Sequence, residues 1–409
     1  MTAENNIKED FIMNVIQGKT ECRPIDTGYD ESRIEMLNKR FGEMIDKKLI
    51  HGAIYCISHK GKVIAHGAIG RNNSMGIDTP MRPDTVFGIA SITKTFTATA
   101  IMQLVEDGYI RLNTPVSEIL PQFAEKPFDG ITLWHLLTHT SGIYPDGGCF
   151  PEAAPKDTWE LIEAAAEKWD GKSEFDWISA GISGGLRRPT GTEWQYCSFG
   201  FALLGEIVTR VSGKNVHDYI EEKIIRPLKM TDSGFYYTPE TAARGYIFDE
   251  GHKNYLDKIV SGEINGRDGE GNVWDKIPST GGGIHSTVYD LIRYANAYIY
   301  GGRFEGARIL GRKSVEKMST VQLTGIPDHC WNANEPDRLY GIGFDIRHGQ
   351  SFSYSDRTIM HEGAGASSLD IDLEEQLAAA WFVPFDTGAN GWSAEPLYNV
   401  QNIIWSGLI

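Results

Sequence analysis

Residues 87–120 read FGIASITKTFTATAIMQLVEDGYIRLNTPVSEIL. Apolar residues recur at helical spacing through the first half of this stretch, and Gly108 follows the last of them. Glycine suits the position just after a helix, because it readily adopts the left-handed conformation that ends many helices. The pattern therefore predicts a buried helix over residues 92–107, with Ser91 and Lys94 at its start.

Ser91 and Lys94 are three positions apart, so on a helix their side chains share one face, about 5–6 Å apart. A serine hydroxyl becomes a nucleophile only when a neighbouring group removes its proton and the resulting charge is stabilised. An ammonium one turn away, with the positive end of the helix dipole, stabilises that charge. The same tetrapeptide also fits a capping serine and a solvated lysine, so the surrounding sequence has to decide.

The composition is that of an ordinary globular protein. The chain has 409 residues, 41% of them hydrophobic and 23% charged, and this length suggests two or three lobes. Its formal net charge of -16 disfavours nucleic acid and anionic lipid surfaces as partners. We therefore expect neither nucleic acid nor a membrane as a partner.

The amino terminus and the cysteines bear on the compartment. Residues 1–28 mix acids with bases and lack an apolar core, so they predict an N-terminal extension and not a signal peptide. No stretch approaches the roughly 18 consecutive apolar residues of a membrane-spanning helix. Five scattered cysteines, an odd number, are typical of reduced thiols. The sequence thus predicts a cytoplasmic protein.

Strand signals lie near both ends of the chain and helix signals in its middle. This order predicts an α+β fold, with an antiparallel sheet flanked by N- and C-terminal helices and an all-helical lobe inserted into it. The predicted catalytic domain covers residues 29–409. It divides into a sheet lobe over about 29–85 and 276–409 and a helical lobe over about 86–275.

Four blocks of the sequence resemble one family, in the expected order and at the expected spacing. They are residues 87–120, 131–143 (ITLWHLLTHTSGI), 190–232 (beginning TGTEWQYCSFG) and 279–294 (STGGGIHSTVYDLIRY). The family is that of the serine β-lactamase-like proteins, which includes class C β-lactamases, low-molecular-weight penicillin-binding proteins, family VIII esterases and D-aminopeptidases. The resemblance covers about residues 30–409 and implies a β-lactamase/transpeptidase-like fold.

The resemblance points to three catalytic residues. Ser91 corresponds to the acylated nucleophile, Lys94 to its lysine partner, and Tyr196 to the tyrosine of a Tyr-x-Asn element. A phenol with a pKa near 10 is no base at neutral pH, but an adjacent ammonium favours its anion. We therefore predict that Lys94 lowers the pKa of Tyr196, which then acts as the general base for Ser91. The alternative for Tyr196 is a core aromatic residue that caps the next helix.

Two departures from the family pattern bear on the substrate. Ser198 stands where the family often has asparagine, and its shorter side chain reaches less far toward a substrate amide. His361 stands at the lysine position of the family's Lys-Thr-Gly strand, in the His-x-Gly form of that element. Losing the lysine and threonine removes the groups that would hold a β-lactam carboxylate. The sequence therefore favours neutral or amine-bearing esters and amides.

The strand that contains His361 is expected to edge the site. By the resemblance, the backbone N–H of Ala364 pairs with that of Ser91 as an oxyanion hole, and Gly363 lets the substrate approach the backbone. His361 fits a direct role and also fits a hydrogen-bonded strand histidine. Glu362 is expected to point away by strand alternation. If it points inward, it would anchor a substrate amine.

Three other patterns offer rival sites. Ser183 lies in GISGG, which matches the GxSxG nucleophile elbow, but arginine and proline follow it, so a Gly-rich loop is predicted. His135 and His139 have the i,i+4 spacing of metal ligands on a helix, yet no zincin glutamate and no third ligand accompany them. Cys197 lies beside the candidate tyrosine, but no base for a thiol nucleophile is suggested. We expect no metal and no organic cofactor.

The sequence therefore predicts a serine hydrolase that cleaves a small ester, amide or short peptide through a Ser91 acyl-enzyme. A carboxylesterase and a D-amino-acid peptidase or amidase are the leading interpretations. The alternatives are a β-lactamase or DD-peptidase, an acyltransferase of the same fold, and a non-catalytic penicillin-binding-like sensor. Loops over residues 144–159 and 171–190 are expected to wall the site and set its specificity.

Overall fold

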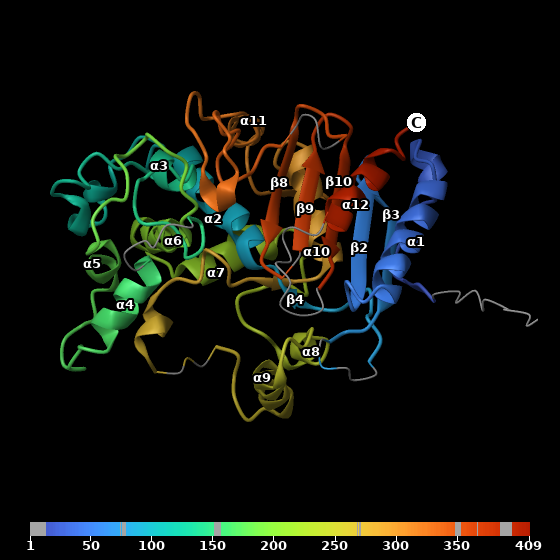
Figure 1. The fold of residues 1–409 in the computed structure, drawn as a ribbon, viewed down its shortest axis with the longest axis horizontal. Coiled ribbons are helices and arrows are strands. Elements are labelled where there is room, and N and C mark those ends of the chain that lie inside the picture. Colours follow the sequence, from blue (N-terminus) through green and yellow to red (C-terminus); the bar gives the residue numbers. More distant parts are fainter. Residues whose placement is uncertain are drawn as a thin grey trace, which may run out of the picture.

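A six-stranded antiparallel sheet is assembled from both ends of the chain (Figure 1). The computed structural model describes residues 14–409 except 74, 76–78, 151–156, 268, 270, 348–352, 366 and 385–394. The strands lie in the order β1 (Ile16–Gln17), β3 (Lys62–Gly70), β2 (Gly52–His59), β10 (Leu377–Phe382), β9 (Ser367–Asp372) and β8 (Thr358–Gly363). The N-terminal hairpin thus joins the C-terminal strands through the β2–β10 pair, in which Ile57 lies opposite Ala379.

Helices cover both faces of the sheet and leave two hydrophobic cores. Ile54 and Tyr55 are neighbours in β2 and belong to different cores, because successive side chains of a strand point to opposite faces. On the Tyr55 side pack α1 (Ser32–Asp46) and α12 (Glu395–Trp405). On the Ile54 side packs α10 (Val288–Ile299), which contacts β10, β2 and β9. This arrangement confirms the α+β class predicted from the sequence.

The helical lobe lies beside the β8 edge of the sheet (Figure 1). Helices α8 and α9, which the sequence placed in the helical lobe, lie at the bottom of the view apart from the rest of that lobe, and α11 lies at the top between α3 and β8. Besides α1, α10 and α12, the described α-helices are α2 (Thr93–Glu106), α3 (Leu133–Leu137), α4 (Thr158–Ala166), α5 (Trp177–Ile182), α6 (Ser198–Ser212), α7 (Val216–Ile220), α8 (Pro239–Ala242), α9 (Glu250–Ser261) and α11 (Arg312–Met318). The short strands are β4 (Phe87–Gly88) with β5 (His285–Ser286), and β6 (Arg303–Phe304) with β7 (Ala307–Arg308).

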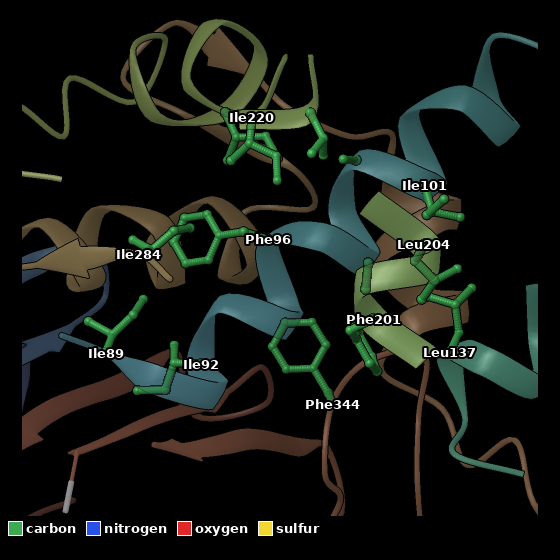
Figure 2. Packing of buried hydrophobic residues seen from close by; sticks show 14 of the residues in the cluster. Ile89, Ile92, Phe96, Ile101, Leu137, Phe201, Leu204, Ile220, Ile284 and Phe344 are labelled. Atoms are coloured by element: carbon green, nitrogen blue, oxygen red, sulfur yellow. The ribbon is translucent and has the colours of Figure 1, made fainter. Parts of the chain in front are cut away.

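Helix α2 occupies the junction of the two lobes. Every residue from 93 to 102 is buried, so the helix is surrounded on all sides. Figure 2 shows the apolar side chains around it, among them Phe201, Ile284 and Phe344. The ring of Phe96 stacks on that of Tyr294, with 4.0 Å between centroids. The largest hydrophobic core of the protein therefore forms around the segment that carries Ser91 and Lys94.

Buried threonines on α2 find partners on neighbouring backbone. The hydroxyl of Thr97 donates to the carbonyl of Thr280 at 2.8 Å, and that of Thr99 donates to the carbonyl of Thr95 at 2.8 Å. A buried hydroxyl without a partner would cost free energy, so these bonds let polar residues lie inside the core. The Thr97 bond also fixes α2 against the segment that precedes Gly281.

Two parts of the chain differ from the predicted layout. Residues 16–17, predicted to lie in an N-terminal extension, instead add the edge strand β1, where Ile16 lies opposite Ala68. The predicted loop over 171–190 contains helix α5, because the Asp176 side chain caps its start by accepting from the Ser179 N–H at 3.1 Å. Residues 1–13 of the extension and 151–156 of the other loop lie outside the described residues.

The lengths of the helices bear on the expectation that the chain has no membrane-spanning helix. In the described portion of the chain, no helix combines the length and the apolar composition that crossing a bilayer requires. The most thoroughly buried helix, α2, extends only from Thr93 to Glu106.

The packing around α2 predicts the stability of a variant. Phe96→Ala removes a fully buried ring from the central core, so we expect the free energy of unfolding to fall by about 3–5 kcal/mol. Tyr109→Ala is the control, because the Tyr109 side chain is 68% exposed and its loss should cost less than about 0.5 kcal/mol. Urea unfolding followed by circular dichroism measures both values. Equal losses in the two variants would contradict the central role of α2.

Candidate active site

Ser91 lies in a 3-10 turn between β4 and α2. The preceding residue, Ala90, has φ 45°, in the left-handed region that costs a residue with a Cβ about 1–3 kcal/mol. Neighbouring segments hold this turn: the N–H of Ile89 donates to the carbonyl of Ile284 at 2.9 Å, and the hydroxyl of Ser367 donates to the carbonyl of Ile89 at 3.4 Å. The strained backbone therefore fixes the start of α2 and the position of the Ser91 hydroxyl.

Lys94 is completely buried and makes three hydrogen bonds. Its Nζ donates to Ser91 Oγ at 3.0 Å, to Ser198 Oγ at 2.9 Å and to the carbonyl of Gly281 at 2.7 Å. An ammonium has three N–H donors, so the site satisfies each of them. Burial lowers the pKa of Lys94 to about 8, although the charge of Asp146 acts in the opposite direction. Near neutral pH, Lys94 therefore exchanges between its charged and neutral forms.

A carboxylate, that of Asp146, is linked to this lysine through Ser198. Asp146 Oδ1 accepts from the N–H of Ser198 at 2.7 Å, and its Oδ2 accepts from the Ser198 hydroxyl. The N–H of Asp146 in turn donates to the carbonyl of Tyr196 at 2.9 Å. Ser198 thus bridges Lys94 and Asp146, so the hydrogen bonds of its hydroxyl are internal to the site. This arrangement differs from the predicted contact between Ser198 and substrate.

Tyr196 lies next to both Ser91 and Lys94. The Nζ of Lys94 is 4.7 Å from the centroid of the tyrosine ring, and Ser91 hydrogen-bonds to its hydroxyl. The sequence predicted that Lys94 lowers the pKa of Tyr196. The structure corrects this: burial, assisted by the charge of Asp146, raises the pKa of Tyr196 well above its usual value. The phenol is therefore protonated, and Lys94 is the group whose proton is more easily lost.

The ring of His139 packs against the ring of Tyr196. Their rings lie 4.6 Å apart, and His139 Nδ1 accepts from the N–H of Cys197 at 3.1 Å. Burial lowers the pKa of His139 well below its usual value, so the ring is neutral. His135 belongs to a different structure, because its Nδ1 accepts from the N–H of Thr132 at 3.0 Å at the start of α3. Within the described ranges, no cluster of histidine, cysteine and acidic side chains could hold a metal ion.

Strand β8 forms the opposite wall. A Cβ added to Gly363 would lie 2.2 Å from the carbonyl oxygen of Ile89, so only glycine lets β8 pack against the turn that carries Ser91. His361 is buried on the same face of β8, and its Nδ1 donates to the carbonyl of Glu362 at 2.7 Å. Burial and the charge of Lys94 lower the pKa of His361 to about 4, so the imidazole is neutral. Ala364 follows in an exposed turn.

The acidic neighbour on β8 has an internal partner. Glu362 Oε2 accepts from Arg347 at 3.1 Å. Arg347 also contacts Asp345, which in turn pairs with Arg338 at 2.8 Å. Because alternate residues of a strand point to opposite faces, Glu362 lies on the face opposite His361. The inward orientation considered for Glu362 therefore does not occur in this structure.

The rival nucleophiles lie in other environments. Ser183 follows the last residue of α5 and donates to the carbonyl of Ala180 at 2.7 Å, so it is not on the strand–turn–helix element that a nucleophile elbow requires. Cys197 is buried, its Sγ donates to the carbonyl of Tyr144 at 3.4 Å, and burial raises its pKa to about 12. A thiol with so high a pKa is a poor nucleophile near neutral pH.

The predicted loops contribute unequally to the site. The first supplies Asp146, which sequence reasoning missed although its Asp-Gly-Gly turn is a visible signal. Trp159 and Trp177, which belong to the ranges expected to wall the site, pack edge to face on Phe199, with ring centroids 6.0 and 5.7 Å away. The Gly281 carbonyl was also missed, because a backbone acceptor leaves no mark in side-chain patterns.

The fold and the site together define a serine hydrolase of the β-lactamase/transpeptidase-like class. A family model described as Beta-lactamase matches residues 37–393, so the chain belongs to the Beta-lactamase family. Penicillin-binding protein 4 of Amycolatopsis lactamdurans is 28% identical over 81% of this chain and 83% of its own length. Esterase EstB of Burkholderia gladioli is 30% identical over 49% of this chain and 50% of its own length.

Solved structures agree with this fold. The hydrolase EstCE1, described as having promiscuous acyltransferase activity, superimposes with a TM-score of 0.71 at 19% identity, over 92% of this chain and 99% of its own. At so low an identity the likeness concerns the fold.

The contact between β8 and Ile89 predicts a stability difference between two glycine variants. Gly363→Ala places a Cβ against a backbone oxygen, so we expect the free energy of unfolding to fall by about 1–3 kcal/mol. Gly88→Ala is the matched control, because a Cβ there meets no atom within 4 Å. Thermal and urea unfolding of the two proteins give the comparison. A Gly363→Ala protein as stable as the Gly88→Ala protein would refute the close packing.

Proposed function

We propose that the protein hydrolyses carboxylic esters through an acyl-enzyme on Ser91. One observation carries this proposal: a buried lysine, Lys94, lies 3.0 Å from the Ser91 hydroxyl and has a pKa of about 8. A neutral amine at hydrogen-bond distance from a serine is a general base in position to activate it. The esterases and penicillin-binding proteins among its relatives support the same class of chemistry.

In the proposed acylation, the neutral amine of Lys94 takes the proton of Ser91 as Oγ bonds to the carbonyl carbon. The carbonyl π electrons move to the oxygen, where the backbone N–H groups of Ser91 and Ala364 stabilise the charge. When the tetrahedral intermediate collapses, Tyr196 donates its proton to the departing alkoxide and recovers one from protonated Lys94. The alcohol leaves, and the neutral lysine is restored.

Deacylation repeats these steps with water. Lys94, through Tyr196, takes a proton from the attacking water, and the Ser91 oxygen recovers a proton as the carboxylic acid leaves. Asp146 and Ser198 act as positioning residues, because they hold the lysine and adjust its pKa without touching the reacting atoms. The hydrogen bond from Lys94 to the Gly281 carbonyl keeps Nζ directed toward Ser91.

The charges around β8 favour an uncharged ester over a carboxylate-bearing substrate. His361 is neutral, and the nearby guanidinium groups of Arg338 and Arg347 are already paired with acidic side chains. A β-lactam or a peptide with a free carboxylate needs a cation at this edge to offset the loss of its hydration. A D-amino-acid peptidase or amidase acting on amine-bearing substrates is the second candidate, because the chain's formal net charge of -16 suits a cationic substrate better than an anionic one.

Covalent labelling tests the nucleophile. A fluorophosphonate should form a bond between phosphorus and Ser91 Oγ with loss of fluoride, giving one adduct that peptide mapping places at residue 91. Ser91→Ala should abolish the adduct and lower kcat/KM for p-nitrophenyl acetate by about 10⁴-fold. Ser183→Ala is the matched control and should be labelled like the unaltered protein. Absence of an adduct on the unaltered protein would favour a non-catalytic sensor, and an adduct at Ser183 would make GISGG the site.

Substrate comparison separates the remaining classes. We expect kcat/KM to be highest for p-nitrophenyl acetate, lower for D-alanyl p-nitroanilide and lowest for nitrocefin. Fastest turnover of the anilide would make the protein a D-amino-acid peptidase. Fastest turnover of nitrocefin would overturn the argument from the paired arginines and the neutral histidine.

The lysine mechanism also predicts a pH profile. Lys94 must be neutral to accept the Ser91 proton, so kcat/KM should rise with pH through a midpoint near 8 and then level off. Asp146→Asn removes a negative charge that raises the pKa of Lys94, so the midpoint should move to lower pH. Asp107→Asn, at the other end of α2, is the control and should leave the midpoint in place. A midpoint that stays fixed in Asp146→Asn would rule out Lys94 as the titrating base.

A further inference from the structure

A large exposed indole lies beside the proposed proton donor. The Trp331 side chain is 56% exposed, and its ring centroid is 5.3 Å from that of Tyr196, at an interplanar angle of 54°. The other rings that contact Tyr196 belong to His139, Trp194 and His361, which are buried. Burying so large an apolar ring is more favourable than leaving it in water. The exposed indole is therefore a candidate for contact with a ligand.

The backbone of this loop is strained at the tryptophan. Trp331 has φ 51° and ψ 31°, and Asn332 and Asn334 also have positive φ. Asparagine adopts this left-handed conformation fairly often, but a bulky residue does so rarely. Strain of this kind persists where the surrounding structure enforces it, and it is concentrated at functional sites.

A buried base enforces the conformation. The N–H of Trp331 donates to the carbonyl of Cys149 at 2.6 Å, on the loop that supplies Asp146. The adjacent Cys330 is fully buried, and its N–H donates to Asp328 Oδ1 at 2.8 Å. The backbones of Asp328 and Glu335 pair through two hydrogen bonds of 2.8 and 2.9 Å, which close the loop behind the indole. The tip is therefore held rigidly with its indole outward, and binding a ligand there needs little further ordering.

We propose that Trp331 is a stacking platform for the alcohol portion of the ester, and that its preferred ligand is an uncharged aromatic alcohol. This inference rests on the proposed function, in which Tyr196 gives its proton to the departing oxygen. A group packed against Tyr196 consequently flanks the leaving alcohol and not the acyl chain. An aromatic alcohol would stack on the indole and lie across the entrance to the site.

The charges near the platform favour a neutral ligand. The guanidinium of Arg338 lies over the ring of Trp194, 4.4 Å from its centroid, and pairs with Asp328 and Asp345. Its charge is already balanced by these acids, so an anionic group on the alcohol would gain little from it. The chain's formal net charge of -16 acts in the same direction.

The test compares two series of esters on the full-length protein. The first keeps the acetyl group and changes the alcohol from ethyl to phenyl to 2-naphthyl; the second keeps the p-nitrophenyl group and lengthens the acyl chain. In Trp331→Ala, we expect kcat/KM for 2-naphthyl acetate to fall about tenfold more than that for ethyl acetate, because one aromatic contact contributes roughly that factor. Trp331→Phe should restore most of this selectivity. The preference within the acyl series should stay as in the unaltered protein.

A binding measurement separates recognition from catalysis. In the Ser91→Ala background, calorimetry should detect 2-naphthol binding, and adding Trp331→Ala should abolish it. Tyr109→Ala, which removes an exposed aromatic ring at the far end of α2, is the control and should preserve both selectivity and binding.

The outcomes distinguish the platform from the function on which it rests. If fluorophosphonate labels Ser91 but the alcohol selectivity of Trp331→Ala is unchanged, the platform is refuted and the hydrolase stands. If selectivity changes in the acyl series instead, the indole binds the acyl chain and the alcohol assignment is wrong. If Ser91 is not labelled in the unaltered protein, the proposed function itself fails.

Discussion

The burial of one positive charge constrains much of this structure. Removing an ammonium from water is costly unless every N–H finds an acceptor, and Lys94 has no contact with solvent. Its acceptors come from the turn just before α2, the start of α6 and the Gly281 turn, and the last two are 104 and 187 positions away in the sequence. Each must arrive within hydrogen-bond distance for the lysine to be tolerated. The hydrogen bonds that Lys94 requires therefore stabilise the junction of the lobes, and they also hold Ser91 beside an amine of lowered pKa.

The walls of the site depend on close backbone packing. Gly363 permits β8 to lie against the carbonyl of Ile89, and the left-handed Ala90 turns the chain directly into α2. Threonine hydroxyls tie that helix to its surroundings, as Thr97 does with Thr280. The site is thus built on rigid elements, which suits chemistry that requires the serine and its base to keep a fixed separation.

The sequence predicted the α+β class and the pairing of Ser91 with Lys94, because a separation of three residues on a helix determines their proximity. Asp146 escaped prediction, since its partner Ser198 is 52 positions away and only the tertiary fold brings them together. The protonation of Tyr196 was predicted wrongly, because a neighbouring ammonium is visible in the sequence and the extent of burial is not. Strand β1 was missed for a similar reason: two residues are too few to show alternation, and the edge of β3 determines their pairing.

The central strand pair has a consequence for how the chain is made. β2 and β10 are neighbours in the sheet, yet the whole helical lobe separates them in the sequence. The last residues also pack against the segment that precedes α1, since the N–H of Asp30 donates to the carbonyl of Gly407 at 2.7 Å. During synthesis, the β2–β3 hairpin must wait on the ribosome with one edge and one apolar face uncovered until the final strands emerge. The sheet is therefore completed only after the whole helical lobe has been synthesised.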